Sequence, residues 1–518
     1  MATPQEKLAE SLQALRTLQG QGRTAIRSRD LSRTHRERLV KNGFLQEVMK
    51  GWYIPADSRG EAGDSTPWYA SFWDFSAAYL TERFGTDWCL APEQSLSLHA
   101  GNRTVPTILH VRAPKGGNKL TQLLYGTSLM DARYPLPDEA QIVEFGGLRL
   151  YSVPAALITC TAAFFRQAPT DVRAAMAAIK DASGVLALLL QGGHSTIAGR
   201  LAGAFRNAGQ TRIADDILKT MKTAGYTIKE TDPFEDAPDA AVIRRDASPY
   251  VNRIRLMWQR MRPDVIDAFP NAPGLPTDKA AYLKAVDEAD GSDAYHSLSI
   301  EGYRVSAALI EKVRQGNWNP DDDQDDLELR NALAARGYFD AFQSVKDSLD
   351  NVLSGDNAGD VVDEAHGDWY RQLFGPSVAA GIVEAVDLAG YRNGPVYIRR
   401  SMHVPPPRDA VRDCMPALIE LLRGEDEACV RAVLGHFVFV YIHPYMDGNG
   451  RVGRFLMNVM LASGGYPWTI VPVDRRDDYM AALESASVNQ NIVPFAQFLA
   501  ELVQHRLDGK ASPAVPAS

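Results

Sequence analysis

Cysteine, long apolar runs and an excess of basic charge are all missing from this sequence. Its 518 residues include four cysteines, whose spacing matches no zinc-binding pattern. So few thiols favour a reducing, cytoplasmic compartment. The longest apolar stretches, near 185–190 and 433–442, are too short to span a bilayer, and the first residues lack the apolar run of a signal peptide. We therefore expect a cytoplasmic protein with no membrane partner.

The charge balance and several absent motifs narrow the functional classes. A net charge of −9 argues against bulk, non-specific nucleic-acid binding, although one small basic domain stays compatible with it. The sequence contains no Gly-x-x-x-x-Gly-Lys, Gly-x-Ser-x-Gly or His-Glu-x-x-His motif. Hydrophobic residues make up 45% and charged residues 23%, as in ordinary soluble globular proteins. The length predicts two to four domains, because a single core does not grow to this size.

A first, locally basic domain is predicted over residues 1–58. Leucines recur at helical spacing over residues 8–18. Ser32 is suited to cap a second helix, which Asn42 and the following glycine would end. Two short strand-like pieces come next, before residue 55. Helix, helix and hairpin in this order are typical of a winged helix-turn-helix.

This first domain has two possible partners. The run Arg-Glu-Arg-Leu-Val-Lys-Asn-Gly-Phe-Leu, followed by Lys-Gly-Trp-Tyr-Ile-Pro, resembles the N-terminal module of AbiEi-type antitoxin and transcriptional-regulator proteins. The resemblance implies DNA as a partner of residues 1–58. Basic side chains of the second helix could contact DNA phosphates: Arg33, Arg36, Arg38 and Lys41. A protein-binding wing is the alternative.

Residues 59–230 predict an α+β domain, similar to the second half of the AbiEi-type regulators. Strands are predicted at 107–111, 141–145 and 148–151, followed by Ala- and Leu-rich helices near 170–190 and 195–224. Prolines and many aspartates within 229–248 predict a linker to the next domain.

Residues 249–507 are predicted to be nearly all helix. An Asn-Gly-Pro turn and a short β-branched piece within 391–407 predict a small β-hairpin. The acidic run 321–326 predicts a solvated bend, and the Ala, Ser and Pro residues of 508–518 predict a disordered tail. The predicted fold is therefore multidomain: a winged helix-turn-helix and an α+β domain, then a mostly α-helical core with a small β-hairpin.

The reactive groups concentrate in residues 443–454, His-Pro-Tyr-Met-Asp-Gly-Asn-Gly-Arg-Val-Gly-Arg. The apolar run before Pro444 and the helical spacing after Arg451 predict a helix, a loop and a second helix. A helix N-terminus offers unpaired backbone N–H groups to a phosphate. The successive amides of residues 448–450 could therefore form an anion-binding nest.

The side chains of this loop suit phosphoryl or nucleotidyl transfer. His443 has the ordinary pKa of a group that takes a proton from a hydroxyl. Asp447 can bind Mg²⁺, which prefers carboxylate and phosphate oxygens. Arg451 and Arg454 lie three residues apart, so both can face a polyphosphate from one side of the second helix. A metal site, a pair of cations and a base are the parts that such chemistry needs.

The loop resembles the signature of the Fic-domain family, His-Pro-Phe-x-Asp-Gly-Asn-Gly-Arg-x-x-Arg, and departs from it only by an aromatic exchange at Tyr445. The resemblance implies transfer of AMP from ATP, with Mg²⁺, to a Ser, Thr or Tyr hydroxyl of a protein, including the chain itself. It implies His443 as the base and Asp447 as the Mg²⁺ ligand. It also implies a phosphate cradle, made of Gly448, Asn449, Gly450 and Arg451, and Arg454 as the partner of the terminal phosphate.

A second stretch of the same domain, Ser-Leu-Ser-Ile-Glu-Gly, resembles the inhibitory helix of many Fic proteins. This helix is expected over about 293–303. Glu301 would form a charge-assisted pair with Arg454 in place of the terminal phosphate, and Ser297 would join the same network. ATP would then bind with its α-phosphate misplaced for attack. A Ser-capped helix with a surface glutamate is the alternative.

The predicted hairpin resembles the flap of the family, which docks an extended segment of the target by strand addition. Its candidate residues are Val396, Tyr397 and Ile398. An ordinary edge hairpin is the alternative. Ser487 stands where family members often carry asparagine near the adenine pocket, so the choice of nucleotide stays open.

Three functional hypotheses follow. The first is an autoinhibited protein adenylyltransferase with an N-terminal regulatory module, and the intact Gly-Asn-Gly-Arg favours it. The second keeps the Fic fold but transfers a phosphate or another nucleotide. The third is a DNA-binding regulator or the antitoxin half of a fused toxin–antitoxin pair, which is compatible with the first. A homo-oligomer, and inhibition by Glu301 in cis or in trans, are left open.

Overall fold

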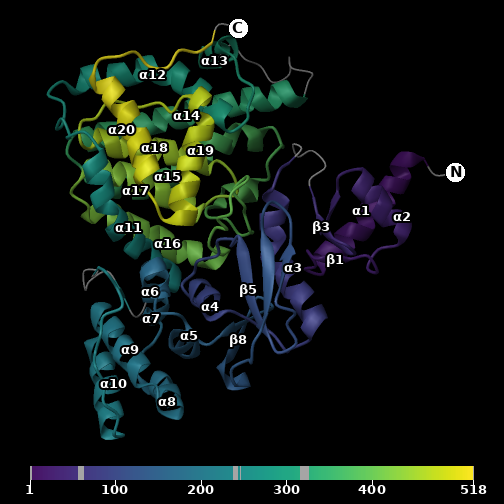
Figure 1. The fold of residues 1–518 in the computed structure, drawn as a ribbon. Helices are drawn as coiled ribbons and strands as arrows, with labels where there is room; N and C mark the ends of the chain where they lie inside the picture. The colour runs from purple at the N-terminus through teal and green to yellow at the C-terminus, as the bar shows by residue number, and fades with distance from the viewer. Residues whose placement is uncertain (1–2, 57–62, 237–242, 245–246, 316–325, 517–518) are drawn as a thin grey trace. The chain divides into compact units, whose positions relative to one another are not determined.

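The computed structural model describes residues 3–56, 63–236, 243–244, 247–315 and 326–516. Internal contacts divide the chain into two compact units, and Figure 1 shows their elements. The first unit comprises Met1–Arg253 together with Tyr397–Val404, and the second comprises Ile254–Val396 together with Pro405–Ser518. The predicted change of domain near 230–249 thus lies before the point at which the contacts divide the chain.

The first unit begins with two helices and a small antiparallel sheet in the strand order β1-β3-β2. Its elements are α1 (Pro4–Gly20), β1 (Ile26–Arg27), α2 (Arg33–Lys41), β2 (Leu45–Met49) and β3 (Trp52–Pro55). Ser32 caps α2 by accepting a hydrogen bond from the His35 amide at 3.2 Å. Leucines of both helices pack with Ile26 in one hydrophobic cluster. The predicted order of helix, helix and hairpin is confirmed, and its role as a winged helix-turn-helix stays a prediction.

A four-stranded sheet follows, in the order β4-β5-β7-β6, in which only β5 and β7 pair in parallel. Figure 1 shows α3 alongside β5, and aromatic side chains of α3 pack with β5 in one core. The elements are α3 (Thr66–Phe84), β4 (Cys89–Leu90), α4 (Pro92–His99), β5 (Ile108–Ala113), β6 (Lys119–Gln122) and β7 (Ser128–Arg133).

The remainder of the first unit contains a two-stranded sheet and a group of helices. The region predicted as helix over 170–190 contains two helices, α7 and α8. The region predicted over 195–224 also contains two, α9 and α10, because Gly209 takes a left-handed φ of 73° and ends α9. The elements are η1 (Glu139–Gln141), β8 (Ile142–Phe145), β9 (Leu148–Tyr151), α5 (Val153–Thr159), α6 (Phe164–Gln167), α7 (Pro169–Ala177), α8 (Ser183–Gly192), α9 (Ser195–Asn207) and α10 (Thr211–Thr223).

The second unit is helical, as predicted. Helices α14 and α15 pack against each other and against α18, and α17 packs against α18. The helices of this half of the chain are α11 (Pro249–Ala268), α12 (Lys279–Ile300), α13 (Ala307–Arg314), α14 (Asp326–Leu353), α15 (Ala358–Ala379), η3 (Ala385–Ala389), α16 (Arg408–Gly424), α17 (Ala428–Ile442), α18 (Asn449–Ala462), η4 (Val473–Arg475), α19 (Arg476–Asn489) and α20 (Val493–Leu507).

The hairpin predicted within 391–407 is wrong: these residues are all described, and none of them lies in a strand. Four prolines in this stretch lack the N–H that a ladder needs. Arg400 adopts a left-handed φ of 59°, and the Ser401 amide donates to the Ile398 carbonyl at 3.1 Å, which makes a local turn. The flap residues Val396, Tyr397 and Ile398 are therefore not strand residues.

Other predictions concern the ends and loops of the chain. Of the acidic run 321–326, predicted to be a solvated bend, residues 321–325 lie outside the described residues. Asp326 is the first residue of α14. In the predicted disordered tail, residues 508–516 are described, and the Pro513 carbonyl accepts a hydrogen bond from the Ser292 hydroxyl at 2.6 Å. Within the described ranges, no helix combines enough length and enough apolar character to cross a membrane.

The four cysteines are buried and free of disulfides. Burial raises the pKa of Cys89, Cys160 and Cys414 to about 12, so their thiols stay protonated and unreactive near neutrality. Their burial indicates a structural role for these thiols.

Candidate active site

The predicted helix, loop and helix are formed by α17, residues 443–448 and α18. His443 ends α17 in a left-handed conformation, with φ 53°, and its amide still donates to the Phe439 carbonyl at 2.9 Å. Gly448, with φ 76°, is the residue before the first turn of α18. The backbone therefore reverses between two buried helices, and the N-terminus of α18 opens onto the loop.

The loop is held in shape by its own polar and aromatic side chains. The Tyr445 amide donates to Asn449 Oδ1, and Asn449 Nδ2 donates to the Tyr445 carbonyl, both at 2.9 Å. The Tyr445 ring is buried and stacks on Tyr370, with 3.9 Å between centroids and 4° between planes. The side chain of Asn449 is thus committed to the loop, and only its backbone N–H is available to a phosphate.

His443 is suited to accept a proton at one defined nitrogen. Its Nδ1 lies 3.1 Å from the Val440 carbonyl. A carbonyl can only accept, so Nδ1 carries the hydrogen and Nε2 keeps its lone pair. Burial lowers the pKa of His443 to about 4, and the nearby Arg392 guanidinium adds to the effect. The imidazole is therefore neutral, and able to act as a base, at any physiological pH.

Arg451 is a buried cation whose hydrogen bonds are incomplete. It is 1% exposed, and its guanidinium lies over the rings of Tyr303 and Phe374, at 5.2 and 4.9 Å from their centroids. Its Nε and Nη2 find no hydrogen-bond acceptor among the described residues, although Nη2 lies 3.6 Å from an Asp447 oxygen. Buried polar groups are normally satisfied, so these N–H groups point to an anionic ligand.

Arg454, the second predicted cation, is largely occupied, and among its nitrogens only Nη1 finds no acceptor in the described residues. Its Nε donates to Ser297 Oγ at 2.9 Å, and its Nη2 donates to the Ser297 carbonyl at 3.1 Å and to Glu301 Oε1 at 2.7 Å. Burial disfavours the charged guanidinium, but the Glu301 carboxylate outweighs it and raises the pKa of Arg454 above its ordinary value. The structure thus brings Arg454 together with Ser297 and Glu301, which lie 157 and 153 residues earlier in the sequence.

Two glycines show how closely other groups approach the α18 N-terminus. A Cβ added to Gly450 would lie 2.2 Å from Glu301 Oε1, and one added to Gly448 would lie 2.8 Å from the Phe374 ring. Gly448, with its left-handed φ of 76° and the ring beside it, therefore requires glycine, whereas a side chain at Gly450 would displace the Glu301 carboxylate. The Glu301 carboxylate sits directly against the helix end at which a phosphate would bind.

Asp447 is the one acidic candidate for a metal. Its side chain is 62% exposed, and its Oδ1 accepts the Gly448 amide at 2.6 Å. Among the described residues no cluster of three or more potential ligands is preformed. Mg²⁺ commonly binds through one or two carboxylates together with substrate phosphates and water, so a lone exposed carboxylate beside an anion site fits that ion.

Sequence reasoning missed one polar residue behind Arg454, Asp293. Asp293, Ser297 and Glu301 recur every four residues, which places them on one face of α12 and its end. The Tyr338 hydroxyl donates to Asp293 Oδ2 at 2.7 Å. Burial raises the pKa of Asp293 to about 7, although Tyr338 and Arg454 act in the opposite direction. Only the fold shows that this carboxyl belongs to the site.

His436 also lies near Arg454. It is fully buried in α17, and its Nε2 lies 2.7 Å from the Tyr479 hydroxyl. Burial lowers the pKa of His436 to about 4. A neutral imidazole packed against α19 is typical of a structural histidine, so His443 stays the candidate base.

The three arginines of α2 are engaged within the first unit, and Lys41 is exposed. Arg33 pairs with Glu37 at 2.7 Å, Arg36 donates to the Ser28 carbonyl at 2.8 Å, and Arg38 donates to Ser11 Oγ at 2.8 Å. Because the partners are neutral or exposed groups, none of these three arginines is a buried cation that lacks a hydrogen-bond acceptor. DNA binding by residues 1–58 therefore stays a prediction without a specific structural observation behind it.

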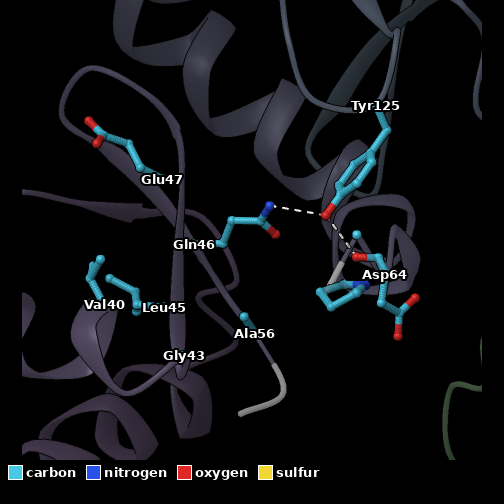
Figure 2. Close-up of a pocket in the computed structure, with 10 residues that line it drawn as sticks. Val40, Gly43, Leu45, Gln46, Glu47, Ala56, Asp64 and Tyr125 are labelled. Carbon is cyan, nitrogen blue, oxygen red and sulfur yellow. Dashed lines mark hydrogen bonds between the residues drawn. The ribbon is translucent and has the colours of Figure 1, made fainter. Parts of the chain in front are cut away.

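The first unit contains a cavity beside β2. Figure 2 shows this cavity of about 330 Å³, in which Gln46 points toward Tyr125. Gln46 Nε2 donates to the Tyr125 hydroxyl at 3.2 Å, and that hydroxyl donates to the Asp64 carbonyl at 2.8 Å. The lining has no pairing of a base with a cation cluster, so this cavity is not the candidate active site.

Comparison with known proteins agrees with the chemistry of the loop. Residues 366–461 match the Fic/DOC family model. The chain is 28% identical over 237 residues to protein adenylyltransferase Fic of Drosophila virilis, which covers 44% of each chain. It is 26% identical over 260 residues to the Nematostella vectensis protein of that name, covering 49% of this chain and 57% of the relative. The chain thus spans about half the length of these curated relatives.

Solved structures give more distant matches. Fic-1 of C. elegans is 18% identical, over 63% of this chain and 90% of the other, with a TM-score of 0.37. A Fic-domain signalling protein of Bacteroides thetaiotaomicron is 16% identical, over 52% of this chain and 99% of the other, with a TM-score of 0.35.

Proposed function

Because this chain is a Fic/DOC-domain protein distantly related to the protein adenylyltransferases Fic, we propose that its second unit transfers AMP from ATP to a hydroxyl side chain of a protein, including its own. We propose further that Glu301 restrains this activity. The observation that carries the proposal is Arg451, a buried guanidinium with unmatched N–H groups beside a glycine-lined helix N-terminus. Polyphosphate is the ligand class that such an arrangement accepts.

The residues divide the reaction between them. Nε2 of His443 takes the proton of the target hydroxyl while the hydroxyl oxygen attacks the α-phosphorus. The bond from that phosphorus to the oxygen bridging to the β-phosphate breaks, and pyrophosphate leaves with the electron pair. Arg451 and the N–H groups at the start of α18 bind the phosphate oxygens. Asp447 would hold Mg²⁺, which supplies charge neutralisation at the phosphates.

The restraint follows from the occupied position of Arg454. Its Nη2 donates to Glu301 Oε1 at 2.7 Å, and among its nitrogens only Nη1 finds no acceptor in the described residues, so the terminal phosphate of ATP would have to compete with Glu301 for this guanidinium. The carboxylate also lies against Gly450, where the phosphate chain would pass. A misplacement of the α-phosphate by about 1 Å costs on the order of a hundredfold in rate.

The test uses ATP labelled on the α-phosphate, with Mg²⁺ and four full-length proteins: wild type, Glu301→Gly, His443→Ala and the double variant. We expect protein labelling to rise about a hundredfold in Glu301→Gly, and to disappear whenever His443 is replaced. His505→Ala, an exposed histidine of α20, is the matched control and should not change labelling.

Two other outcomes of the labelling experiment would change or contradict the proposal. Labelling from the γ-phosphate instead of the α-phosphate would replace AMP transfer by phosphotransfer, which is the alternative chemistry for this fold. Absence of label from either position in Glu301→Gly, with the protein folded, would contradict the proposal.

A further inference from the structure

A short segment of the catalytic half of the chain, Tyr397–Val404, is built into the first unit. Val404 is 6% exposed and belongs to the hydrophobic core around α3 and β5, against which Met402 also packs. The Val105 amide donates to the Met402 carbonyl at 2.9 Å. The chain therefore leaves the second unit after Val396, contributes to the core of the first unit, and returns at Pro405.

The other end of this segment is anchored near the start of α3. The Arg400 amide donates to Thr66 Oγ1 at 2.9 Å, and the Thr66 hydroxyl donates to Asp64 Oδ1 at 2.6 Å. Arg399 pairs with Asp64 at 3.9 Å. Burial opposes the charged carboxylate, but Thr66 and the two arginines outweigh it and lower the pKa of Asp64. Asp64 is thus an ionised anchor for the segment.

The same anchor is linked to β2 across the cavity of Figure 2. Gln46 of β2 donates to the Tyr125 hydroxyl, which in turn donates to the Asp64 carbonyl. Hydrogen bonds on the backbone and on the side chain of Asp64 therefore connect the small N-terminal sheet to the 397–404 segment through this one residue. A change at β2 has a physical route to this segment.

Arg392 ties both ends of the segment to the catalytic loop. It is 2% exposed, and its guanidinium donates to the Gly394 carbonyl at 3.1 Å and to the Pro406 carbonyl, just outside either end of the segment. Its Nε donates to the His443 carbonyl at 2.7 Å, and its own amide donates to the Pro444 carbonyl at 2.9 Å. One buried side chain thus fixes the spacing between the flanks of the segment and the backbone of the proposed base.

We infer that Arg392 is a positioning residue through which the first unit, by holding Tyr397–Val404, sets the placement of His443. This regulation rests on the proposed function of the site. The first unit provides the anchor at Asp64 and Thr66, the chain transmits its position to Gly394 and Pro406, and the planar guanidinium fork passes it to the His443 carbonyl. Lysine cannot replace that fork, because it lacks the geometry for several carbonyls at once.

Amide hydrogen exchange of the full chain tests the link without requiring activity. The Asp64→Asn, Thr66→Val double variant should raise exchange in 397–404 about tenfold, as expected for the loss of about 1.4 kcal/mol of local hydrogen bonding. It should also raise exchange in the peptide around 440–447. In the Arg392→Lys background, the double variant should still raise exchange in 397–404 but should no longer raise it around 440–447.

A matched control removes similar interactions elsewhere in the first unit. Thr17→Val deletes a hydroxyl that donates to the Gln13 carbonyl at 2.9 Å, and Asp216→Asn deletes an ion pair with Arg212 at 3.9 Å. This control should leave both peptides unchanged. Tyr125→Phe, which cuts the path at the cavity and leaves Arg392 in place, should give a weaker form of the double variant's effect and guards against misfolding of Arg392→Lys.

Activity separates positioning from a merely structural role. In the Glu301→Gly background, Arg392→Lys should lower kcat for α-label transfer about ten- to a hundredfold with little change in KM for ATP. Faster exchange in 397–404 without any change in 440–447 would overturn the inference, and so would unchanged exchange in both. A Glu301→Gly protein that transfers no label would instead refute the proposed function, since the exchange result does not depend on it.

Discussion

The arginines of α18 and those of α2 are in opposite situations. Arg451 is buried with unmatched N–H groups, and Arg454 is buried against a carboxylate from another helix. Arg38 of α2 is only partly buried, and it donates to neighbouring groups of its own unit. A buried cation without enough partners implies a ligand or a competitor for one, whereas a surface cation with local partners implies neither. Basic residues in a motif therefore have to be judged by burial and pairing.

The strongest way to break this comparison is Arg451→Gln. In the Glu301→Gly background we expect transfer to fall about a hundredfold or more, because charge-assisted hydrogen bonds to phosphate are worth about 1.5–3 kcal/mol each. Thermal stability should not fall, since the change removes a buried charge whose hydrogen bonds are incomplete. Radiolabel transfer and thermal unfolding measure the two effects. A less stable Arg451→Gln protein with full activity would mean that Arg451 stabilises the fold and does not bind phosphate.

Asp293→Asn sharpens the comparison by probing the acid behind Arg454. Burial raises the pKa of Asp293 to about 7, so the folded state holds a proton that the unfolded state releases near its ordinary pKa of 3.8. The wild type should therefore lose about 1.4 kcal/mol per pH unit between about pH 4 and 7, and nothing further above that range. The variant should lack the part of this dependence that Asp293 supplies, whereas Asp290, whose pKa burial raises to about 6, contributes equally to both proteins.

The measurement is the difference in unfolding free energy between wild type and Asp293→Asn at pH 5, 6 and 7. From pH 5 to pH 7 the wild type should lose about 2 kcal/mol or more of unfolding free energy relative to the variant. Asp340→Asn, which disrupts a surface pair with Arg336 at 3.0 Å, is the control. A difference that stays constant with pH would mean that Asp293 is ionised throughout.

The pH dependence of transfer gives the next smaller effect. Burial lowers the pKa of His443 to about 4, so the base stays neutral well below pH 6. Label transfer by the Glu301→Gly, Asp293→Asn double variant, which lacks the titrating acid behind Arg454, should be nearly equal at pH 7.5 and 5.5. A histidine with the ordinary pKa of 6.5 would lose about tenfold over the same interval. A tenfold loss would mean that the His443 imidazole is exposed to water and keeps its ordinary pKa.

Arg38→Gln should have the smallest effect. It removes the hydrogen bonds to the Lys7 carbonyl and Ser11 Oγ, which join α2 to α1. We expect a loss of about 1 kcal/mol in unfolding free energy and unchanged AMP transfer. Salt-dependent binding of duplex DNA by the wild type that Arg38→Gln abolishes would give this arginine a ligand after all, and the contrast with α18 would fail.

Local signals predicted much of the fold. Ser32 and the Asn-Gly after α2 predicted its two ends, and Pro444 predicted the end of α17, because capping groups and missing N–H donors act within a few residues. The flap strand was wrong for a complementary reason. Val396–Ile398 has the β-branched residues of a strand, but the segment after Val396 finds its partners in the core of the other unit. No local pattern records such a partner.

The sequence by itself determined which chemistry the loop at 443–454 can perform, since a base, an acid, glycines and two arginines follow one another within a few residues of chain. Tertiary structure alone decided how those groups are used. It matched Arg454 to Glu301 and left Arg451 without enough acceptors. It also set Arg392 against the His443 carbonyl and carried 397–404 into the first unit. Burial and pairing depend on residues far apart along the chain, and so only the folded molecule specifies them.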